Sequence, residues 1–477
     1  MVVLQLGLYV VAVLDPRDLA RRAVEICIEL GAEFADARLL SHSGLRVEVA
    51  DGRVREVKSM DEVGLALRCF VGGGWGFTST SILMLDEVER ACREAFKLAK
   101  AAGQRVEEKA SLKCECRGFS IHVKPRVDPL NLSVEEKVEM CLGMEREMRE
   151  LDSRVRSTSS VYLEAREELF VVNSLGLEST AIMPTLLVVA SAYASEAGVT
   201  QRGYESNGGV GGLEVLEPKG PKAVARDAAQ EALELLKAKS PPAGKFTCIL
   251  DPELAGVFIH EAFGHACEAD IVLSGGSILE GMIGKSVGSR EVVVKDDPTL
   301  KGLFGYTPVD SEGVEGRGTT IVEMGTLKSY LHSLETSSRM SAKPTGNGRA
   351  QGYMNAPIVR MTNTFIDRGS WKVEELFEGV ERGVYAKGSS YGYVDTAKGE
   401  FVFKCSRLYI VERGELKQLC RDAALSGFTL EVLRNVDAVA GDLSFKPGLC
   451  GKEGQWVRVS TGSPHIRVRD VVIGGML

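Results

Sequence analysis

Several features that would assign the chain to a familiar class of protein are absent from its sequence. There is no long run of lysine and arginine, and the formal net charge is −8, which argues against a nucleic-acid partner. The apolar stretch at the N-terminus, residues 1–14, is too short for a membrane helix, which needs about 20 apolar residues. No basic residue precedes this stretch and no small-residue cleavage pattern follows it, so it is not typical of a signal peptide. We therefore expect a cytoplasmic protein that binds neither nucleic acid nor membranes.

The cysteines do not form the pattern of a secreted disulfide framework. There are 11 of them in 477 residues, which is an odd number in a long chain. Most stand singly among apolar residues and are expected to be small core side chains, as for Cys27, Cys69, Cys141 and Cys248. Cys114 and Cys116 are spaced as alternate residues of a strand, whose side chains face opposite sides, so we expect no metal site there.

Periodic patterns of apolar residues predict alternating helices and strands in the first half of the chain. Helical spacing is found at 18–30, 85–101, 133–151 and 221–239. Strand patterns at 37–49 and 54–58 surround the hairpin signal Asp51-Gly52, and another strand is predicted at 63–71. A meander of short strands is expected between residues 155 and 203.

The proline-rich loop at 240–244 marks the expected boundary between two domains, residues 1–242 and 243–477. A chain of this length is long enough for two or three domains, each with its own core. The second part has a helical pattern at 253–268, followed by many short strands that glycine and proline separate. We therefore predict an α+β fold with antiparallel or mixed sheets and packed helices.

The most informative stretch is His260-Glu261-Ala262-Phe263-Gly264-His265, in which two of the six histidines bracket a glutamate. On a straight α-helix, this spacing points the two rings about 140° apart, too far round to share one ion. A single π-type turn of about 4.4 residues brings them back into line, and such turns are frequent at functional sites. The motif is therefore either a metal site on a locally distorted helix or a pair of unrelated histidines.

The surroundings of the motif favour the metal site. The segment FTCIL at 246–250 is typical of a buried strand, and Asp251 and Pro252 then suit the N-cap and first position of a helix. The helix carries an apolar body formed by Leu254, Val257, Phe258, Ala262 and Phe263. A histidine pair on a largely buried helix needs polar partners, and a divalent cation supplies one.

Four stretches together resemble the TldD/PmbA (modulator of DNA gyrase) peptidase family, and the resemblance covers the chain from about Leu19. The first is the histidine motif with Glu268 and Asp270 after it. The others follow in the family's order: RMTNTF at 360–365, GYVD at 392–395 with GEFVF at 399–403, and CGKEGQ at 450–455.

The resemblance implies a zinc metallopeptidase with one Zn²⁺ per chain. In that family the catalytic, TldD-type subunit binds zinc through two histidines and a distant cysteine, which correspond here to His260, His265 and Cys450. The TldE/PmbA-type partner lacks the histidine motif, so this chain is similar to the catalytic subunit. The family implies a dimer, with such a paralogue or with itself, in which an extended peptide lies between sheet edges and reaches the metal. The metal site would lie in the C-terminal domain, and the N-terminal domain would help to form the dimer and an access tunnel.

Spacing alone leaves the third ligand open between Glu268 and Cys450. Cys267 is about 200° round the helix from His265 and is expected to point away. Glu268 is on roughly the same face as His265, where it would be a ligand or a hydrogen-bond acceptor for an imidazole N–H. Cys450 lies in a glycine-rich turn that can aim a thiolate, and the resemblance favours it. A thiolate with two imidazoles favours zinc over iron or manganese.

Glu261 is the only carboxylate between the two histidines and is our candidate for the general base. Beside a zinc ion that lowers the pKa of water towards about 7, it would take a proton and pass it to the leaving amine. The sequence does not identify the residue that stabilises the oxyanion besides the metal. The candidates are Tyr306, Tyr353, Tyr391 and His332.

Substrate contacts are expected mainly from main-chain groups, because a peptidase that adds an extended chain to a sheet edge needs few special side chains. Thr362 and Asn363 lie on a predicted strand that would serve as such an edge, and they are our candidate substrate-binding residues.

Two other functions fit the same residues. The chain could be a zinc-dependent amidase or deacylase that acts on a modified small peptide. Alternatively, it is a non-catalytic structural or regulatory subunit of a peptidase complex, in which the histidines are structural. Glu261 argues against this last function, because a purely structural zinc uses four protein ligands and needs no free carboxylate.

Overall fold

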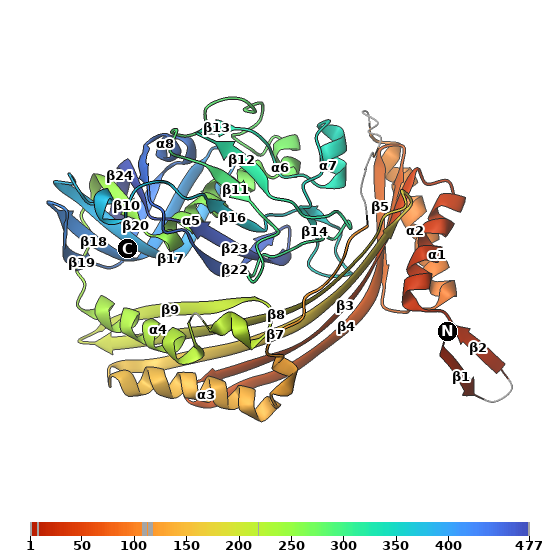
Figure 1. Cartoon of the computed structure of the whole chain (residues 1–477), viewed down its shortest axis with the longest axis horizontal. Coiled ribbons are helices and arrows are strands. Elements are labelled where there is room, and N and C mark those ends of the chain that lie inside the picture. Colours follow the sequence, from red (N-terminus) through yellow and green to blue (C-terminus); the bar gives the residue numbers. More distant parts are fainter. Residues whose placement is uncertain (1, 7–8, 107–111, 113–117, 218, 476–477) are drawn as a thin grey trace.

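The computed structural model describes residues 2–6, 9–106, 112, 118–217 and 219–475. A long curved sheet comes from the N-terminal half, and the C-terminal half is seated on its concave side (Figure 1). A hairpin of β1 (Val2–Leu6) and β2 (Tyr9–Val13) projects from the N-terminal end. None of the helices in the described ranges is long and apolar enough to cross a membrane. Cys114 and Cys116 lie outside the described residues.

The N-terminal sheet has seven strands in the order β5-β4-β3-β7-β8-β6, with β9 also paired to β8. Neighbouring strands are antiparallel except β6 and β8, which are parallel. The strands are β3 (Phe34–Ala50), β4 (Arg53–Val71), β5 (Gly74–Thr80), β6 (Ser120–His122), β7 (Val155–Asn173), β8 (Glu178–Glu196) and β9 (Val199–Val210).

These strands are longer than the sequence patterns predicted. β4 is one strand of 19 residues where two were expected, and residues 155–203 hold long strands instead of a meander of short ones. The prediction is wrong for β4 because the apolar alternation stops where a strand is exposed on both faces, as β4 is between Arg53 and Val63. The predicted hairpin turn is confirmed, since Asp51 (φ 52°) and Gly52 (φ 72°) join β3 to β4 in left-handed conformations.

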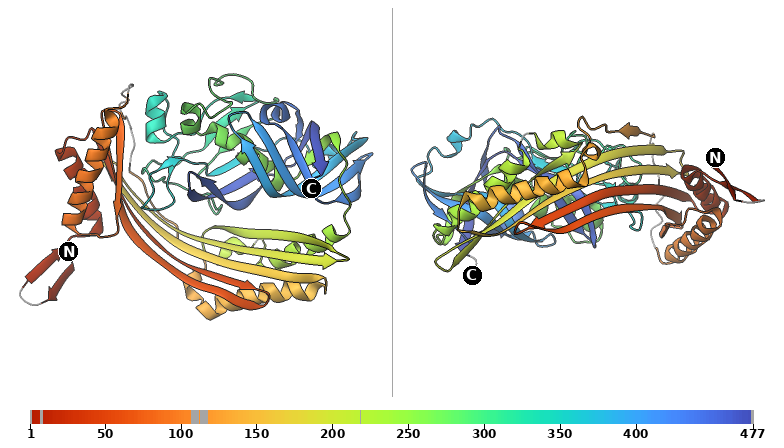
Figure 2. Two further views of the ribbon diagram at one scale, coloured as in Figure 1. Left: turned by 180° about the vertical axis from the view of Figure 1, so that it is seen from behind. Right: turned by 90° about the horizontal axis from the view of Figure 1, so that it is seen from below.

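Four helices pack on this sheet, and all four predicted helices are confirmed to within a few residues. α1 (Pro16–Glu29) and α2 (Leu85–Gly103) lie together at one end of the sheet. α3 (Val134–Leu151) and α4 (Pro221–Leu236) cover the convex face, which turns away from the C-terminal half (Figures 1 and 2). Short 3-10 turns occupy Pro129–Asn131 and Leu213–Leu216.

The C-terminal half is built on two larger sheets and a two-stranded ribbon, and each of these contains strands from this half only. The first sheet has the order β10-β17-β18-β20-β24-β21 with β19 on β18, and comprises β10 (Gly244–Leu250), β17 (Arg382–Asp395), β18 (Glu400–Glu412), β19 (Glu415–Cys420), β20 (Ala423–Phe428), β21 (Val436–Val439) and β24 (Ile466–Gly475). The second has the order β13-β12-β11-β16-β23-β22, and comprises β11 (Val294–Asp296), β12 (Thr319–Glu323), β13 (Thr326–Leu327), β16 (Asn363–Ile366), β22 (Ser444–Lys452) and β23 (Gln455–Ser463). The ribbon pairs β14 (Gly348–Arg349) with β15 (Ile358–Val359).

One helical segment lies between these two sheets and carries the histidine motif. It begins as α5 (Pro252–Phe258), continues as a π-helix (Ile259–Gly264) and ends in a 3-10 turn (His265–Cys267). Asp251 is confirmed as the N-cap, because its carboxylate accepts a hydrogen bond of 2.9 Å from the N–H of Leu254. The remaining helices are short: α6 (Ala269–Leu273), α7 (Leu334–Arg339), α8 (Thr429–Arg434) and a 3-10 turn at Glu374–Leu376.

Apolar packing fixes the position of this segment. Its buried side chains belong to one core cluster with strands of both C-terminal sheets, and they include Leu254, Phe258, Ile259, Ala262, Phe263 and Ala266. Gly264 is in close contact with Met361, since a Cβ added at Gly264 would lie 2.2 Å from the Met361 sulfur. The absence of a side chain at Gly264 therefore lets the π-helix pack against the residues that precede β16.

Two glycine-to-alanine substitutions should shift stability in opposite directions. Gly264→Ala should lower the melting temperature, because overpacking of this kind costs about 1–3 kcal/mol. Gly143→Ala in α3 should raise it, because the added methyl meets only Arg146 at 3.8 Å and alanine is favoured in helices by about 0.5–1 kcal/mol. Calorimetry of the two variants beside the wild type checks this. A Gly264→Ala protein that melts at or above the wild-type temperature would contradict the packing.

Candidate metal centre

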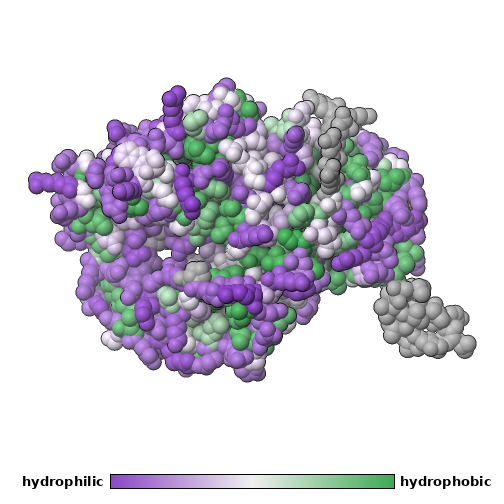
Figure 3. Space-filling model, viewed as in Figure 1, coloured by the Kyte–Doolittle hydropathy of each residue, from purple (hydrophilic) through white to green (hydrophobic). Residues whose placement is uncertain are grey.

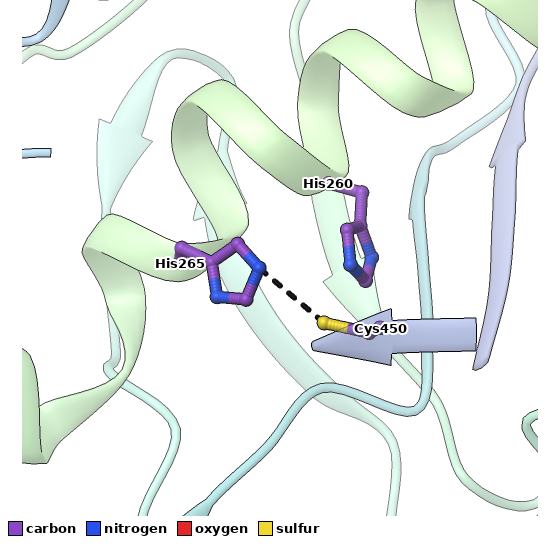
Figure 4. A group of neighbouring side chains, drawn as sticks. All are labelled: His260, His265 and Cys450. Atoms are coloured by element: carbon purple, nitrogen blue, oxygen red, sulfur yellow. Dashed lines mark hydrogen bonds between the residues drawn. The ribbon is translucent and has the colours of Figure 1, made fainter. Parts of the chain in front are cut away.

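The π-helix brings His260 and His265 to the same side of the segment. Their ring centroids are 5.3 Å apart with an interplanar angle of 81°, and both side chains point towards β22 (Figure 4). A helix with one wider turn thus corrects the mismatch of a five-residue spacing, as the sequence predicted. The two histidines are neighbours in space and not an unrelated pair.

Cys450 reaches the two histidines from β22, which pairs with β23. The Cys450 Sγ lies 3.3 Å from the His265 Nε2, and the ligand atoms of His260, His265 and Cys450 all lie within 4.8 Å of one another. Cys450 is 4% exposed, and His260 is 1% exposed. The three residues therefore form a compact cluster that one ion can contact.

The chemistry of this cluster fits a zinc ion. Among the residues that the structure describes, neither ring nitrogen of His260 has a hydrogen-bond partner, although the ring is buried. A buried polar group without a partner is costly, and a metal ion would take up the lone pair of one nitrogen. Two imidazoles and a thiolate are typical zinc ligands, and three protein ligands leave one position open, as in catalytic sites.

The charges around Cys450 favour the form of the side chain that binds metals. Burial raises the pKa of the Cys450 thiol, but the charge of His260 and the hydrogen bond with His265 outweigh burial and lower the pKa to about 5. Conversely, burial lowers the pKa of His265, but the charge of Glu268 and the hydrogen bond with Cys450 raise it well above its usual value. The lowered pKa of Cys450 favours the thiolate, which is the form of cysteine that binds metals.

Glu268 lies behind His265 and orients its ring. The Glu268 Oε2 is 2.9 Å from the His265 Nδ1, which leaves Nε2 directed at Cys450. Glu268 is fully buried, and burial raises its pKa, but the charges of His265 and Lys452 lower the pKa to about 2. This geometry fits the role of a hydrogen-bond partner for a metal-bound histidine better than that of a ligand. Cys267 is buried in the apolar core and is not part of the cluster, as its position on the helix predicted.

Two buried basic residues connect the histidine segment to the β22–β23 hairpin. The Lys452 Nζ lies 3.1 Å from the Glu268 Oε2 and 2.7 Å from the Asp270 Oδ1. Arg360, which is fully buried, donates to the carbonyl oxygens of Cys450 and Gln455. Sequence reasoning noted both basic residues within family motifs but assigned them no role. A buried lysine or arginine needs carboxylate or carbonyl partners, but the sequence does not show which ones.

Glu261 lies at the boundary between the cluster and a cavity. Its side chain is 42% exposed, and its Oε2 is 3.6 Å from the His265 Nε2. The cavity has a volume of about 180 Å³, and its lining includes His260 and Glu261 from the helix, Leu449 from β22, and Tyr204 from β9. The molecular surface is hollowed where the C-terminal half meets the long sheet (Figure 3). Glu261 is therefore accessible from the space between β22 and β9.

Tyr204 was missed by sequence reasoning, because nothing in its local sequence indicates that β9 lies opposite β22. Of the four residues considered for the oxyanion, none lines the cavity beside Glu261 within the described part of the chain. Tyr306 and His332 are buried elsewhere, and Tyr391 is 57% exposed on β17. Tyr353 lines a separate groove of about 380 Å³, together with Leu449 and Trp456.

The predicted edge at Thr362 and Asn363 is wrong. β16 is an inner strand, with β11 on one side and β23 on the other. Both side chains are fully buried: Thr362 is hydrogen-bonded to Asp296, and the Asn363 amide donates to the Asp297 carbonyl. They have no surface from which to contact a peptide. The outer strand of this sheet on the side of the metal cluster is β22.

Family models match the chain in three consecutive parts. The PmbA/TldA metallopeptidase domain 1 matches residues 35–99, the central domain matches 127–236, and the C-terminal domain matches 243–475. The chain belongs to the PmbA/TldD metallopeptidase family. The histidine segment and Cys450 both lie within residues 243–475, the part of this chain that the C-terminal domain model matches.

Several relatives align over almost the whole chain. A metalloprotease of Methanocaldococcus jannaschii is 41% identical over 446 residues, covering 93% of this chain and 97% of that protein. A zinc metalloprotease TldD homolog of Saccharolobus solfataricus is 30% identical over 463 residues, covering 94% of this chain and 98% of that protein. The fold is shared with a putative modulator of DNA gyrase from Thermotoga maritima, with a TM-score of 0.78, 24% identity and coverage of 96% and 100%. The fold is also shared with TldE from Thermococcus kodakarensis, with a TM-score of 0.75 at 16% identity. The match covers 96% of this chain and 99% of that one.

Loss of the Lys452 ammonium should weaken metal binding. Lys452→Met removes the ammonium group that pairs with Glu268. Substitutions among the residues that orient a metal-bound histidine lower metal affinity by about 10–100-fold. Competition with a chromophoric chelator measures the affinity. The matched control is Lys398→Met, since Lys398 is an exposed lysine whose one ion pair among the described residues is with Asp395 at 3.3 Å. Equal zinc affinity of the folded Lys452→Met protein and the wild type would show that this ion pair does not orient His265.

Proposed function

We propose that the chain is a zinc-dependent peptidase that holds one zinc ion with His260, His265 and Cys450. One observation carries the proposal: a buried cluster of two imidazoles and a thiolate, with an unpartnered His260 ring among the described residues, borders a cavity through Glu261. Membership of a metallopeptidase family and similarity to a zinc metalloprotease support the choice of reaction and of metal.

Each residue of the cluster has a separate task in this proposal. His260, His265 and Cys450 hold the ion, and Glu268 fixes the ring of His265 so that Nε2 faces Cys450. Bound zinc would supply Lewis acidity, which makes a water molecule more acidic and a peptide carbonyl more electrophilic. Glu261 is the general base, because its carboxylate is accessible from the cavity and lies next to a ligand. It would then deliver the proton to the leaving amine.

The substrate in this proposal is an extended or unfolded peptide. β22 is the outer strand of its sheet, and the cavity beside it also borders β9 of the long sheet. An outer strand offers backbone N–H and C=O groups to an incoming chain, so that binding depends little on the substrate's side chains. A peptide along β22 would pass Leu449 and reach the position of Cys450.

The setting of the proposed enzyme follows from the resemblance to TldD-type subunits. We infer a cytoplasmic enzyme that works as a dimer, either with a paralogue that lacks the histidine motif or with a second copy of itself. No nucleic-acid partner is proposed, because the net charge of −8 gives no general attraction to phosphates.

Metal content and peptidase activity measured on the same samples test the proposal. An unfolded peptide with blocked ends serves as the substrate. We expect one zinc per chain in the wild type and in Glu261→Gln, and activity in Glu261→Gln reduced by about 10²–10⁴-fold. Cys450→Ser should lose both zinc and activity.

Other outcomes of this experiment identify the competing functions. Cleavage of only a modified small peptide would indicate an amidase. Wild-type protein that binds zinc but hydrolyses neither substrate would indicate a structural subunit. Full activity of Glu261→Gln would overturn the assigned general base.

A further inference from the structure

A groove lies between the β22–β23 hairpin and the long sheet. It has a volume of about 380 Å³ and is lined on one side by Leu449, Trp456 and Arg458 of the hairpin. Side chains of β3, β4, β7 and β8 line the other side, on the concave face of the sheet (Figure 1). Leu449 also lines the cavity beside Glu261, so it borders both spaces. A peptide that leaves the metal cluster past Leu449 would therefore enter this groove.

Arg458 lies in this groove without an anionic partner. Its side chain is half-buried, and across the described residues it forms no ion pair. One side-chain hydrogen bond holds it, from Nη1 to the Phe304 carbonyl at 3.0 Å, and the guanidinium lies 5.9 Å from the centroid of the Phe304 ring. A guanidinium has five N–H donors, so this hydrogen bond leaves most of them for a ligand.

Arg458 is also close to the metal cluster. It is paired with Leu449 across the hairpin, and the next pair is Val457 with Cys450. Residues paired directly across two antiparallel strands have Cα atoms about 4.5–5.5 Å apart. Successive side chains of a strand face opposite sides, so Cys450 points towards the histidines while Leu449 and Arg458 line the groove. Arg458 is therefore placed to contact a peptide within a few residues of the bond that the zinc site would cleave.

The positive charge around Arg458 is only partly balanced. Arg349 is buried, also lines the groove, and donates a hydrogen bond of 2.7 Å to the Arg458 carbonyl. Among the described residues of the lining, the carboxylates are Glu167 and the exposed Glu62, and neither forms an ion pair. Burial lowers the pKa of Arg458, and the charge of Glu167 opposes this only in part. A bound carboxylate would offset the remaining positive charge.

We propose that Arg458 binds a carboxylate of the peptide substrate and thereby selects acidic peptides. This inference rests on the proposed peptidase function and specifies the class of peptide that the site takes. A carboxylate has two oxygens that match the planar fork of a guanidinium, and such charge-assisted pairs are among the stronger hydrogen bonds. The carboxylate belongs either to a glutamate or aspartate side chain or to the C-terminus of the peptide. Arg458 then determines specificity and takes no part in the chemical step.

Hydrolysis of matched peptides by the zinc-loaded, full-length chain tests this specificity. The peptides have blocked ends and differ only in whether one position near the cleaved bond, taken in turn, holds glutamate, glutamine or lysine. We expect kcat/KM for the glutamate peptide to exceed that for the glutamine peptide by about tenfold or more, because the amide cannot form a hydrogen bond between charged groups. Glutamine peptides of increasing length, with a free or an amidated C-terminus, show whether Arg458 binds the chain end instead.

Substitutions at Arg458 should change the preference and not only the rate. Arg458→Gln should bring the ratio of kcat/KM with and without the preferred carboxylate close to one, and Arg458→Glu should favour the lysine peptide. Loss of packing against Phe304 would not reverse a preference. Arg156→Gln is the matched control, because Arg156 is exposed near the start of β7 and should leave the preference as in the wild type. Zinc content, circular dichroism and melting curves show whether each variant holds metal and is folded.

The outcomes separate this inference from the proposed function. A wild type that hydrolyses the peptides but prefers neither an acidic side chain nor a free C-terminus overturns the inference alone, as does one that prefers lysine. A folded, zinc-loaded Arg458→Gln protein that keeps the wild-type preference also overturns it. If the wild type hydrolyses none of the peptides, the peptidase proposal fails, and calorimetric affinities for the same peptides decide the inference. Tighter binding of the peptides that carry the carboxylate would then support it, and equal affinity would overturn it.

Discussion

The position of the two histidines depends on one wider turn in a buried helix. With regular α-helical geometry, a five-residue spacing would point the rings of His260 and His265 in different directions. The π-helix at Ile259–Gly264 removes that mismatch, and apolar packing between two sheets holds the helix in place. Gly264 makes this packing feasible because a side chain there would collide with Met361. Both histidines of the candidate metal centre are therefore positioned by this turn.

The centre also depends on contacts between segments that are far apart in the sequence. Cys450 arrives on β22, and two buried cations tie that strand to the histidine segment: Lys452 through Glu268 and Asp270, and Arg360 through the Cys450 carbonyl. The neighbouring His260 and His265 outweigh the burial of Cys450 and lower the pKa of its thiol to about 5, which favours the thiolate form that binds metals. The fold thus places a thiol with a lowered pKa beside two imidazoles, and both kinds of side chain are metal ligands.

Short sequence motifs predicted the helix cap and the hairpin turn, because neighbouring residues determine these features. The N-cap at Asp251 and the hairpin turn at Asp51-Gly52 each depend on a few adjacent residues. The π-type turn was expected from the five-residue spacing of His260 and His265 if both contact one ion, and the structure contains this turn. The lengths of β4 and its neighbours were not predicted, because exposed stretches of a strand carry no apolar alternation. Sheet order was the larger difficulty: that β22 and not β16 is the outer strand depends on pairings between distant segments. The place of Tyr204 beside the metal cluster depends on the same kind of long-range packing.

X-ray absorption at the zinc edge, on protein loaded with one zinc per chain, tests the central claim most directly. The account predicts one sulfur at about 2.3 Å and nitrogen or oxygen ligands at about 2.0–2.1 Å, with the imidazole scattering of two histidines. In Cys450→Ser the sulfur contribution should disappear. A wild-type spectrum with only nitrogen and oxygen ligands, or with two or more sulfurs, would contradict the assignment of His260, His265 and Cys450 to one ion.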